Sequence, residues 1–281
     1  MATVGIVSPG AMGGALGRGW AEAGHRVVAT LAGRSARTRA LAHGIEELPT
    51  LADVVAAADV VVSVVPPGEA LAVARAVRAA AGEALYVDLN AVAPATVARV
   101  ADAVAPWDVV DGSISGGPPD EGVTRVYLSG PRAPEVAALG HPRLDVRVLD
   151  GGVGAASAVK MSTASVYKGM AALLLHAVVA AEANGVADVV LDDLARAYPD
   201  EVARIAPRLS LSASKAHRYV GEMREIAVAQ EAAGLPREVF EAMAVAYESV
   251  AATAAGARSP EEAARDTDVA EVVRLLRRRD V

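Results

Sequence analysis

The sequence predicts an N-terminal α/β domain, one long connecting helix and an all-helical C-terminal domain. Over the first half of the chain, short runs rich in β-branched residues alternate with helical patterns, which is typical of a parallel sheet covered by helices on both faces. Near residue 150 the strand-like runs stop, and every later segment has a helical pattern. Because 281 residues are enough for two domains, we expect one domain at residues 1–152 and the other at 153–281.

The α/β domain is expected to hold seven strands, most of them followed by a helix. Strands that alternate with helices are joined by right-handed crossovers, so they lie parallel in one sheet. Gly24 supplies a stop for the first helix, and Pro66 halts the third strand. The expected strands are residues 3–8, 26–30, 58–65, 84–89, 107–114, 125–130 and 145–150, and the clearest helices are residues 11–23, 69–81 and 94–104.

The second half begins with a helix from Ala155 to about residue 184, where Gly185 supplies a stop. A further helix is expected within residues 212–234, which have a polar start and end in glycine. The last helical segment, residues 259–278, opens with Ser259, Pro260 and Glu262. These residues form a capping box with proline at the first helical position.

Composition excludes several classes of function. Apolar residues make up 53% of the chain and aromatic residues only 3%, so the core must consist largely of Ala, Val and Leu. The net charge of −7 argues against a nucleic-acid surface, which needs basic patches. The absence of cysteine excludes disulfides and thiolate chemistry. The five histidines are scattered, and no pair has the helical spacing of metal ligands, so we expect no metal site.

We expect a cytoplasmic protein without a membrane span. The N-terminus lacks the basic region of a signal peptide and leads directly into a strand pattern. The apolar stretch near residues 170–181 is short, and Lys168, His176 and Glu182 interrupt or flank it. This stretch indicates a buried helix, with His176 as a core histidine.

The turn after the first strand resembles the glycine-rich fingerprint that holds a dinucleotide pyrophosphate, and predicts a Rossmann-like domain. Gly10 fills the place where the backbone approaches the phosphates, and Gly13 the place where helix and strand pack closely. Ser8 replaces the glycine of the tight turn, and it fits if its backbone stays outside the glycine-only region. Amides at the start of the next helix would face the phosphates. The expected turn residues are Ser8, Pro9, Gly10, Ala11, Met12 and Gly13.

The residues after the second strand favour NADP(H) over NAD(H). An NAD site usually places an acidic residue at this position to bind the ribose hydroxyls, yet no acidic residue occurs between Ala29 and Glu46. Guanidinium and hydroxyl groups cluster there instead, and arginine binds phosphate oxygens in a fork. The residues expected to receive the 2′-phosphate are Gly33, Arg34, Ser35 and Arg37, with Val65, Pro66 and Asn90 completing the cofactor site.

Four blocks of sequence resemble the β-hydroxyacid dehydrogenase superfamily, which includes 3-hydroxyisobutyrate and 6-phosphogluconate dehydrogenases. The blocks are GIVSPGAMG, DLNAVAPATV, DGSISGGPPDEGVTRVYLSG and GGVGAASAVKMSTAS, at residues 5–13, 88–97, 111–130 and 151–165. Residues 160–174 and 214–227 look closer to a less characterised branch, whose C-terminal domain is usually described only as 6-phosphogluconate-dehydrogenase-like. The resemblance implies a homodimer in which the helical domains of two chains pack together.

The resemblance places the family's catalytic lysine at Lys160. An ammonium group that is partly desolvated near a cofactor has a lowered pKa, so it can give or take the proton of the substrate oxygen near neutral pH. The family usually has asparagine four residues later, where this chain has Ala164. The ordinary hydroxyacid substrate therefore cannot simply be carried over.

The expected substrate contacts come from three segments. Ser115, Gly116 and Gly117 match the family's substrate loop, and adjacent glycines can expose backbone amides to a carboxylate. Thr163 and Tyr167 share a helix face with Lys160 by their spacing. His217 is a candidate to close the pocket, from this subunit or a neighbouring one.

Three functions remain open at this point. The leading one is an NADP(H)-dependent oxidoreductase acting on a small carbonyl or hydroxyl substrate. The Ser-Gly-Gly loop of the protein favours a substrate that carries an acidic group. The second is an NADPH-dependent imine reductase, which the missing asparagine and Tyr167 permit, although Lys160 favours carbonyl chemistry. The third is a non-catalytic NADPH-binding sensor.

Overall fold

The computed structural model describes residues 1–278 and divides the chain into two compact units. The first unit is Met1–Ser162, and the second begins at Thr163. The division falls inside one long helix, α7 (Ala155–Ala183), whose bounds agree with the helix expected from the sequence. The boundary expected after residue 152 precedes this helix, whose first turns belong to the α/β unit.

The first unit is built on one sheet of eight strands in the order β3-β2-β1-β4-β5-β6-β7-β8. Strands β1 to β6 are mutually parallel. The chain builds outward from β1 to β3 on one side and from β4 to β8 on the other, so the order reverses between β1 and β4. The strands are β1 (Thr3–Ile6), β2 (Arg26–Ala29), β3 (Glu46–Glu47), β4 (Val60–Ser63), β5 (Leu85–Asp88), β6 (Val109–Ser115), β7 (Thr124–Ser129) and β8 (Leu144–Val148).

Two features of the sheet differ from the expectation of seven parallel strands. Strand β7 is antiparallel to β6, because residues 116–123 between them hold only the short 3₁₀ turn Pro119–Glu121. A parallel connection needs a crossover of a dozen or more residues, so this loop can only reverse the chain. Strand β3 was not expected, since two glutamates carry no strand pattern.

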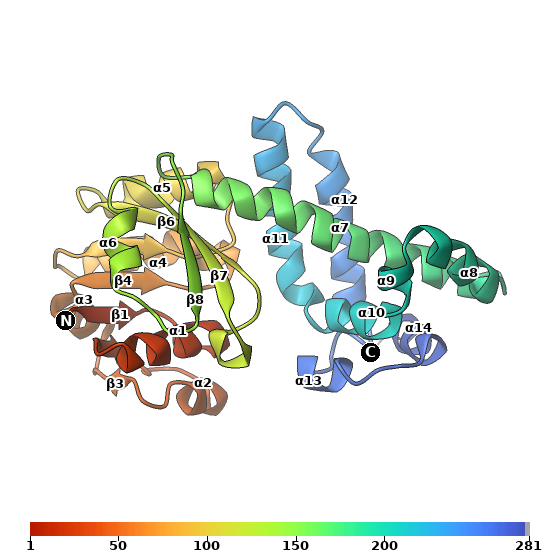
Figure 1. The fold of residues 1–281 in the computed structure, drawn as a ribbon, viewed down its shortest axis with the longest axis horizontal. Helices are drawn as coiled ribbons and strands as arrows, with labels where there is room; N and C mark the ends of the chain where they lie inside the picture. Colours follow the sequence, from red (N-terminus) through yellow and green to blue (C-terminus); the bar gives the residue numbers. More distant parts are fainter. Residues whose placement is uncertain (279–281) are drawn as a thin grey trace. The chain divides into compact units, whose positions relative to one another are not determined.

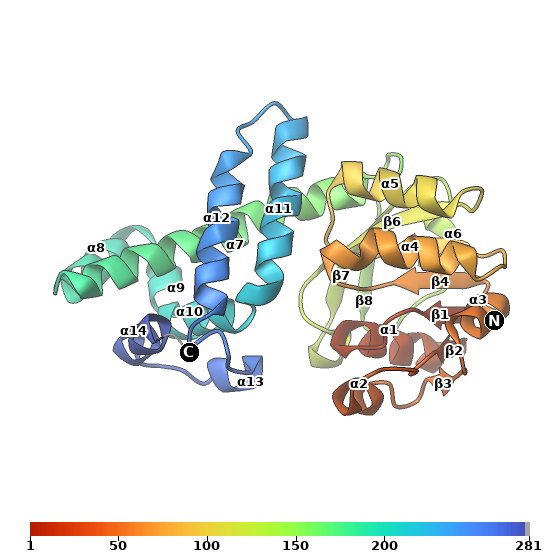
Figure 2. The same ribbon diagram turned by 180° about the vertical axis from the view of Figure 1, so that it is seen from behind.

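Helices cover both faces of the sheet (Figures 1 and 2). Side chains of α1 and α6 pack into one hydrophobic cluster with the sheet, and those of α3, α4 and α5 pack into another. Both clusters consist mainly of Val, Ala and Leu, as the composition predicted. The helices of this unit before α7 are α1 (Ala11–Glu22), α2 (Ala36–Leu41), α3 (Leu51–Ala57), α4 (Ala70–Ala79), α5 (Pro94–Val104) and α6 (Ala133–Ala138).

The described residues of the second unit form helices and no strand. The α11–α12 pair forms a hairpin, visible in Figure 1. After the rest of α7 come α8 (Ala187–Ala197), α9 (Pro199–Val202), α10 (Ile205–Ser214), α11 (Ala216–Ala232), α12 (Glu238–Ala251), α13 (Pro260–Ala263) and α14 (Val269–Arg277).

Two expected helices are each split in the structure. The segment 212–234 begins in α10, and α11 starts only after Lys215. Ser259 and Glu262 do form the expected capping box, but α13 ends within one turn and Asp268 caps a separate helix, α14. The Asp268 side chain accepts from the Ala270 and Glu271 amides, and aspartate side chains that bond nearby backbone groups favour a break over a continuous helix.

Helix α7 is long and apolar enough to cross a membrane by length and composition alone. In its most apolar window 44% of the residues are buried inside the protein, which also occurs in core helices of soluble proteins. His176 does not occupy the core position expected of it, because its side chain is exposed on this helix. The apolar run that predicted burial covers more than one helix face.

Candidate functional site

The glycine-rich turn lies where the strand order of the sheet reverses. Ser8, Pro9 and Gly10 follow β1, and Val65 follows the neighbouring strand β4. In open α/β sheets, ligands bind in the crevice outside the carboxyl ends of the strands at such a reversal. The topology therefore brings the turn and the loop after β4 together at the position where a dinucleotide binds.

The backbone of the turn accommodates serine in place of the first glycine. The Gly10 amide donates to the Ser8 carbonyl at 2.9 Å, which closes a tight turn around Pro9. Ala81 is the only non-glycine residue with positive φ among residues 1–278, so Ser8 lies outside the glycine-only region, which meets the condition for serine at this position. A Cβ on Gly13 would lie 2.1 Å from the Ser8 carbonyl oxygen, so close packing requires glycine there. A Cβ on Gly10 would meet open space, which leaves room for a ligand.

The first turn of α1 offers backbone donors beside this space. Its first amides, at Ala11, Met12 and Gly13, have no acceptor within the helix because helical bonds start one turn later. Gly10 is the N-cap and supplies no side chain to cap them. Such amides, together with the helix dipole, bind phosphate groups.

The loop after β2 places basic and hydroxyl groups near the same strand ends. An Nη atom of Arg34 donates to the Val7 carbonyl at 3.3 Å, which holds its guanidinium at the end of β1. Gly33 has a φ of +69°, and Ser35 caps α2 by accepting a hydrogen bond from the Thr38 amide. Arg37 lies in the first turn of α2 and is exposed.

Sequence reasoning missed one acidic residue in this region, Glu47. Strand β3 pairs Glu47 with Ala29, the last residue of β2, so a carboxylate does lie beside that strand end. Glu47 forms an ion pair with Arg39 at 3.6 Å. Only the pairing of the very short β3 reveals this neighbour, since Glu47 lies far along the chain from β2.

A buried polar network joins the loops after β4 and β5. The Asn90 side chain accepts from the Val65 amide at 2.6 Å and donates to Ser63 Oγ at 3.0 Å. The Asp88 carboxylate accepts from both the side chain and the backbone amide of Asn90, at 2.9 Å each. Asn90 therefore fixes the loop that carries Val65 and Pro66. Its side chain is buried, so it shapes the predicted cofactor site rather than lining an open surface.

Lys160 lies in the second turn of α7, where its Nζ donates to the Ile114 carbonyl at 2.6 Å. Burial lowers the pKa of Lys160 because desolvation penalises the charged ammonium. The acceptor belongs to β6, immediately before the loop of Ser115, Gly116 and Gly117. The structure therefore brings the lysine and the start of this loop together within the first unit.

Asp111 anchors the start of the helix that carries Lys160. Its carboxylate accepts from the amides of Gly154 and Ser157 at 2.9 Å each, and from the Ser157 hydroxyl at 2.6 Å. Ser129 Oγ donates to the same carboxylate and accepts from the Ala156 amide, both at 3.0 Å. These side chains from β6 and β7 satisfy amides that a helix start leaves without partners. The sequence placed Asp111 in a family block without giving it a role.

The loop after β6 is exposed and rich in glycine. Gly116 has a φ of +137°, a backbone conformation that residues other than glycine rarely adopt. The Thr124 hydroxyl donates to the Gly117 carbonyl at 2.7 Å. A Cβ on Gly117 would lie 2.8 Å from a carboxylate oxygen of Glu121, so this turn is also closely packed. Ser115 and both glycines remain accessible to a small ligand.

The remaining predicted substrate residues belong to the second unit. Thr163 and Tyr167 lie on α7, where Tyr167 is exposed and Ala164 is buried. His217 is exposed in the first turn of α11, and desolvation and the nearby Arg218 lower its pKa.

A partly buried cluster in the second unit was not recognised from the sequence. Lys168 forms an ion pair with Glu222 and lies 4.4 Å from the centre of the Tyr219 ring. Tyr219 packs edge-on against Tyr247, whose hydroxyl donates to the Lys168 carbonyl at 2.8 Å. The cluster joins α7, α11 and α12, elements whose proximity no sequence pattern indicated.

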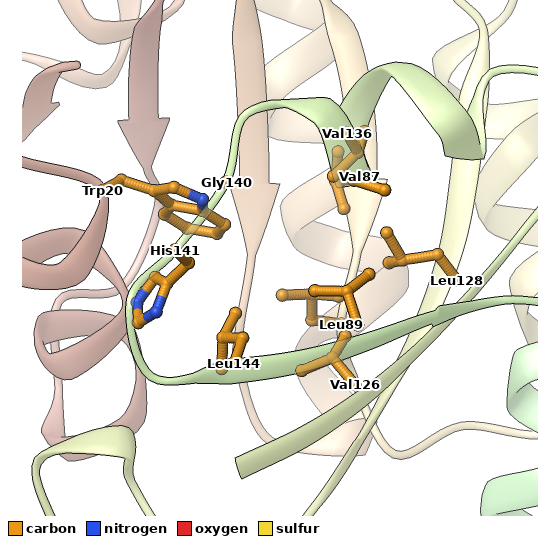
Figure 3. Close-up of a pocket in the computed structure, with 11 residues that line it drawn as sticks. Trp20, Val87, Leu89, Val126, Leu128, Val136, Gly140, His141 and Leu144 are labelled. Carbon is orange, nitrogen blue, oxygen red and sulfur yellow. The ribbon is translucent and has the colours of Figure 1, made fainter. Parts of the chain in front are cut away.

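A small apolar cavity lies elsewhere in the first unit (Figure 3). It has a volume of about 20 Å³, enough for one water molecule and too small for a substrate. Its walls are side chains of the sheet and of α6 together with Trp20 and His141, whose rings meet edge-on at 5.7 Å. The cavity is a packing gap in the core, separate from Lys160 and the glycine-rich turn.

Comparison with family models gives two matches. Residues 3–131 match the NAD binding domain of 6-phosphogluconate dehydrogenase. Residues 181–250 match a domain of unknown function. No curated protein matches the sequence.

Solved structures match almost the whole chain. A conserved protein of unknown function, described as structurally similar to 3-hydroxyacid dehydrogenases, is 30% identical over 89% of this chain and 96% of its own, with a TM-score of 0.67. A conserved hypothetical protein from Sinorhizobium meliloti 1021 is 28% identical over 98% and 96%, with a TM-score of 0.68.

Two characterised enzymes share the fold at lower identity. Mycobacterium tuberculosis 3-hydroxyisobutyrate dehydrogenase, solved with L-serine, is 20% identical over 99% of both chains, with a TM-score of 0.67. A reductive aminase from Aspergillus terreus, solved with NADPH and ethyl-5-oxohexanoate, is 17% identical over 99% and 100%, with a TM-score of 0.56.

Proposed function

We propose that this chain, which belongs to the β-hydroxyacid dehydrogenase superfamily, transfers hydride between NADP(H) and a small carbonyl or hydroxyl substrate that carries an acidic group. The observation that carries the proposal is the Lys160 amine, which is partly buried and donates to the Ile114 carbonyl beside an exposed serine-glycine-glycine loop. A partly desolvated amine at such a position suits proton transfer to or from a substrate oxygen.

The residues of the first unit fit a nicotinamide dinucleotide. Open space at Gly10, the close contact at Gly13 and the first amides of α1 together form a cradle for a pyrophosphate. The match to an NAD binding domain supports the same class of cofactor. Bound NADPH would supply the hydride, and the protein would supply its orientation and a proton.

The preference for NADP(H) rests on Arg34 and Arg37. The contact from Arg34 to Val7 keeps a guanidinium at the end of β1, where a 2′-phosphate can accept two hydrogen bonds. Glu47 is the group that would favour NAD(H), and its ion pair with Arg39 partly neutralises it. We therefore propose that positive charge dominates this end of the cofactor site.

Lys160 would act as the general acid in reduction and as the general base in oxidation. Burial lowers the pKa of its ammonium, so the proton is released more readily than from an exposed lysine. Ser115 and the amides near Gly116 and Gly117 would bind the acidic group of the substrate. These two contacts would orient the reacting carbon toward the nicotinamide.

Fluorescence titration of the purified protein with NADPH and NADH tests the cofactor. We expect NADPH to bind at least about tenfold more tightly, because one good charge-assisted contact accounts for that ratio. NADH binding at least as tightly as NADPH would contradict the arginine assignment. Absence of binding by either cofactor would contradict the proposed function as a whole.

Assays with paired substrates test the reaction class. Small aldehyde and keto acids are compared with imines of matched size, using NADPH as the reductant. We expect turnover of the carbonyl compounds. Turnover of the imines alone would identify an imine reductase, and tight NADPH binding without any turnover would identify a sensor.

We further propose that two copies associate through their helical units in the cytoplasm. Several large apolar side chains of this unit are exposed, among them Leu173 at 64% and Val189 at 71%. A second copy that packs on this unit would remove apolar surface of such side chains from water. Light scattering should give twice the chain mass, and a monomer at micromolar concentration would contradict this proposal.

A further inference from the structure

Arg18 on α1 contacts two segments that are far apart in the sequence. One Nη atom donates to the Leu41 carbonyl at 2.5 Å, at the last residue of α2. The other forms an ion pair with Asp120, in the 3₁₀ turn Pro119–Glu121 of the loop after β6. One side chain therefore joins the helix of the glycine-rich turn, the helix of the 2′-phosphate residues and the loop of Ser115.

The packing around Arg18 depends on small residues. A Cβ on Gly14 would lie 2.5 Å from the Leu41 carbonyl oxygen and 3.3 Å from an Nη atom of Arg18. Any larger residue at position 14 would displace the guanidinium or the end of α2. A cation at the end of α2 also complements the partial negative charge of its carbonyl groups.

The loop itself is rich in glycine, the residue with the least restricted backbone. Gly116 and Gly122 both have φ values in the range that favours glycine, +137° and +154°, and Gly117 lies between them. Such a segment loses much conformational freedom when it becomes ordered. The Thr124 hydroxyl holds it at Gly117, and Arg18 holds it at Asp120, three residues further along the chain.

We propose that the Arg18–Asp120 ion pair is a positioning contact that couples occupancy of the cofactor site to the order of the substrate loop. Neither residue is placed against the substrate. Cofactor binding would reduce the motion of α1 and α2, and the ion pair with Arg18 would then hold Asp120 and its loop in one position. Ser115, Gly116 and Gly117 would therefore be arranged for substrate only when the cofactor is present. This inference rests on the proposed function.

Hydrogen exchange at residues 116–123, measured with and without NADPH, tests the coupling directly. In the wild-type protein we expect NADPH to slow exchange in this segment by about threefold or more. In Asp120→Asn the protection should disappear although NADPH still binds, with a Kd that stays within about threefold of the wild-type value because the coupling is reciprocal. Asp120→Glu, which keeps the charge, should restore it.

The matched control is Glu22→Gln, which removes another ion pair of α1, that of Glu22 with Arg143 at 2.9 Å. This variant should keep the NADPH-dependent protection of residues 116–123. With a substrate found in the paired assays, Asp120→Asn should raise KM about tenfold and change kcat less than threefold, whereas Glu22→Gln should change neither. Arg18→Lys serves as a second variant if Asp120→Asn unfolds.

Two results would separate this inference from the proposed function. NADPH binding to the wild type without protection of the loop, or full protection in Asp120→Asn, would overturn the coupling and leave the proposed function standing. Failure of NADPH to bind the wild type would overturn both.

Discussion

The surroundings of Lys160 lower the pKa of its side chain and hold it in place. The family resemblance indicated the role of this lysine, and the structure adds the partly buried amine, its bond to the Ile114 carbonyl and the capped start of the helix that carries it. None of these three features follows from the sequence around residue 160. The lysine is therefore held in one place, as acid-base chemistry requires.

The first prediction concerns the pH dependence of oxidation. Because burial lowers the pKa of Lys160, the neutral amine that acts as base exists at a lower pH than in an exposed lysine. We expect kcat/KM for alcohol oxidation to rise with pH and to level off at a lower pH than an exposed lysine would allow. An unchanged profile in Lys160→Arg, whose side chain stays protonated, would show that another group provides the base.

The second prediction concerns Arg34. Arg34→Ala removes a guanidinium from the end of β1 and should weaken NADPH binding about tenfold or more, while the Kd for NADH changes little. Arg26→Ala is the control, because Arg26 begins β2 and pairs with the exposed Glu46. Equal weakening of both cofactors by Arg34→Ala would indicate a structural effect.

Among the elements, α7 depends most on groups outside itself. Asp111 and Ser129 supply acceptors for the amides of Gly154, just before the helix, and of Ala156 and Ser157 in its first turn. The predicted helix bounds were correct because an apolar run and a terminal glycine determine them locally. Its cap could not be predicted, because the acceptors come from strands more than twenty residues away.

The third prediction follows from this cap. Asp111→Asn replaces a carboxylate oxygen with an amide donor opposite the donors of α7, and should reduce the free energy of unfolding by about 2–3 kcal/mol. Asp108→Asn is the control, since Asp108 is exposed and pairs only at the surface with Arg132. Urea unfolding provides the measurement, and equal stability of the two variants would contradict the role of the cap.

The packing of α1 against residues 139–143 leads to the fourth prediction. A Cβ on Gly19 would lie 1.9 Å from His141 Nε2, so the imidazole occupies the space that this glycine leaves on the helix. Desolvation lowers the pKa of His141 in the folded protein. Below the unfolded pKa of about 6.5, the unfolded chain therefore binds a proton more readily than the folded one.

Stability should consequently fall as the pH is lowered from about 6.5 through the lower folded pKa, and His141 should contribute no pH dependence above that window. The measurement is thermal unfolding of the wild type and of His141→Gln between about pH 5 and 8, a range that spans the unfolded pKa of histidine. The difference between the two proteins should shrink toward acid pH. A difference that is constant across this range would contradict the prediction.

For the whole molecule, the sequence predicted most of the fold. Seven strands, the long helix and the helical second half were found because each has a local period and local stop residues. The antiparallel β7, the short β3 and the breaks within the last helices were missed, since they depend on loop length, strand pairing and side chains that compete with helix formation.

The candidate site was predicted to a smaller extent than the fold. The glycine-rich turn carries its own sequence pattern, and the backbone at Ser8 meets the condition under which serine fits there. Glu47, the Asp111 cap and the cluster around Lys168 were missed because each combines residues from different elements. The roles of Thr163, Tyr167 and His217 stay predictions.

The most direct test of the central claim is single-turnover oxidation of bound NADPH by a small keto acid. The reaction is followed by the loss of the near-ultraviolet absorbance band of the reduced nicotinamide. The wild-type protein and Lys160→Ala are compared after saturation with NADPH. We predict hydride transfer in the wild type and a rate at least about 100-fold lower in Lys160→Ala, with the Kd for NADPH unchanged. Equal rates in the two proteins, or no hydride transfer in the wild type to any carbonyl substrate, would contradict the account.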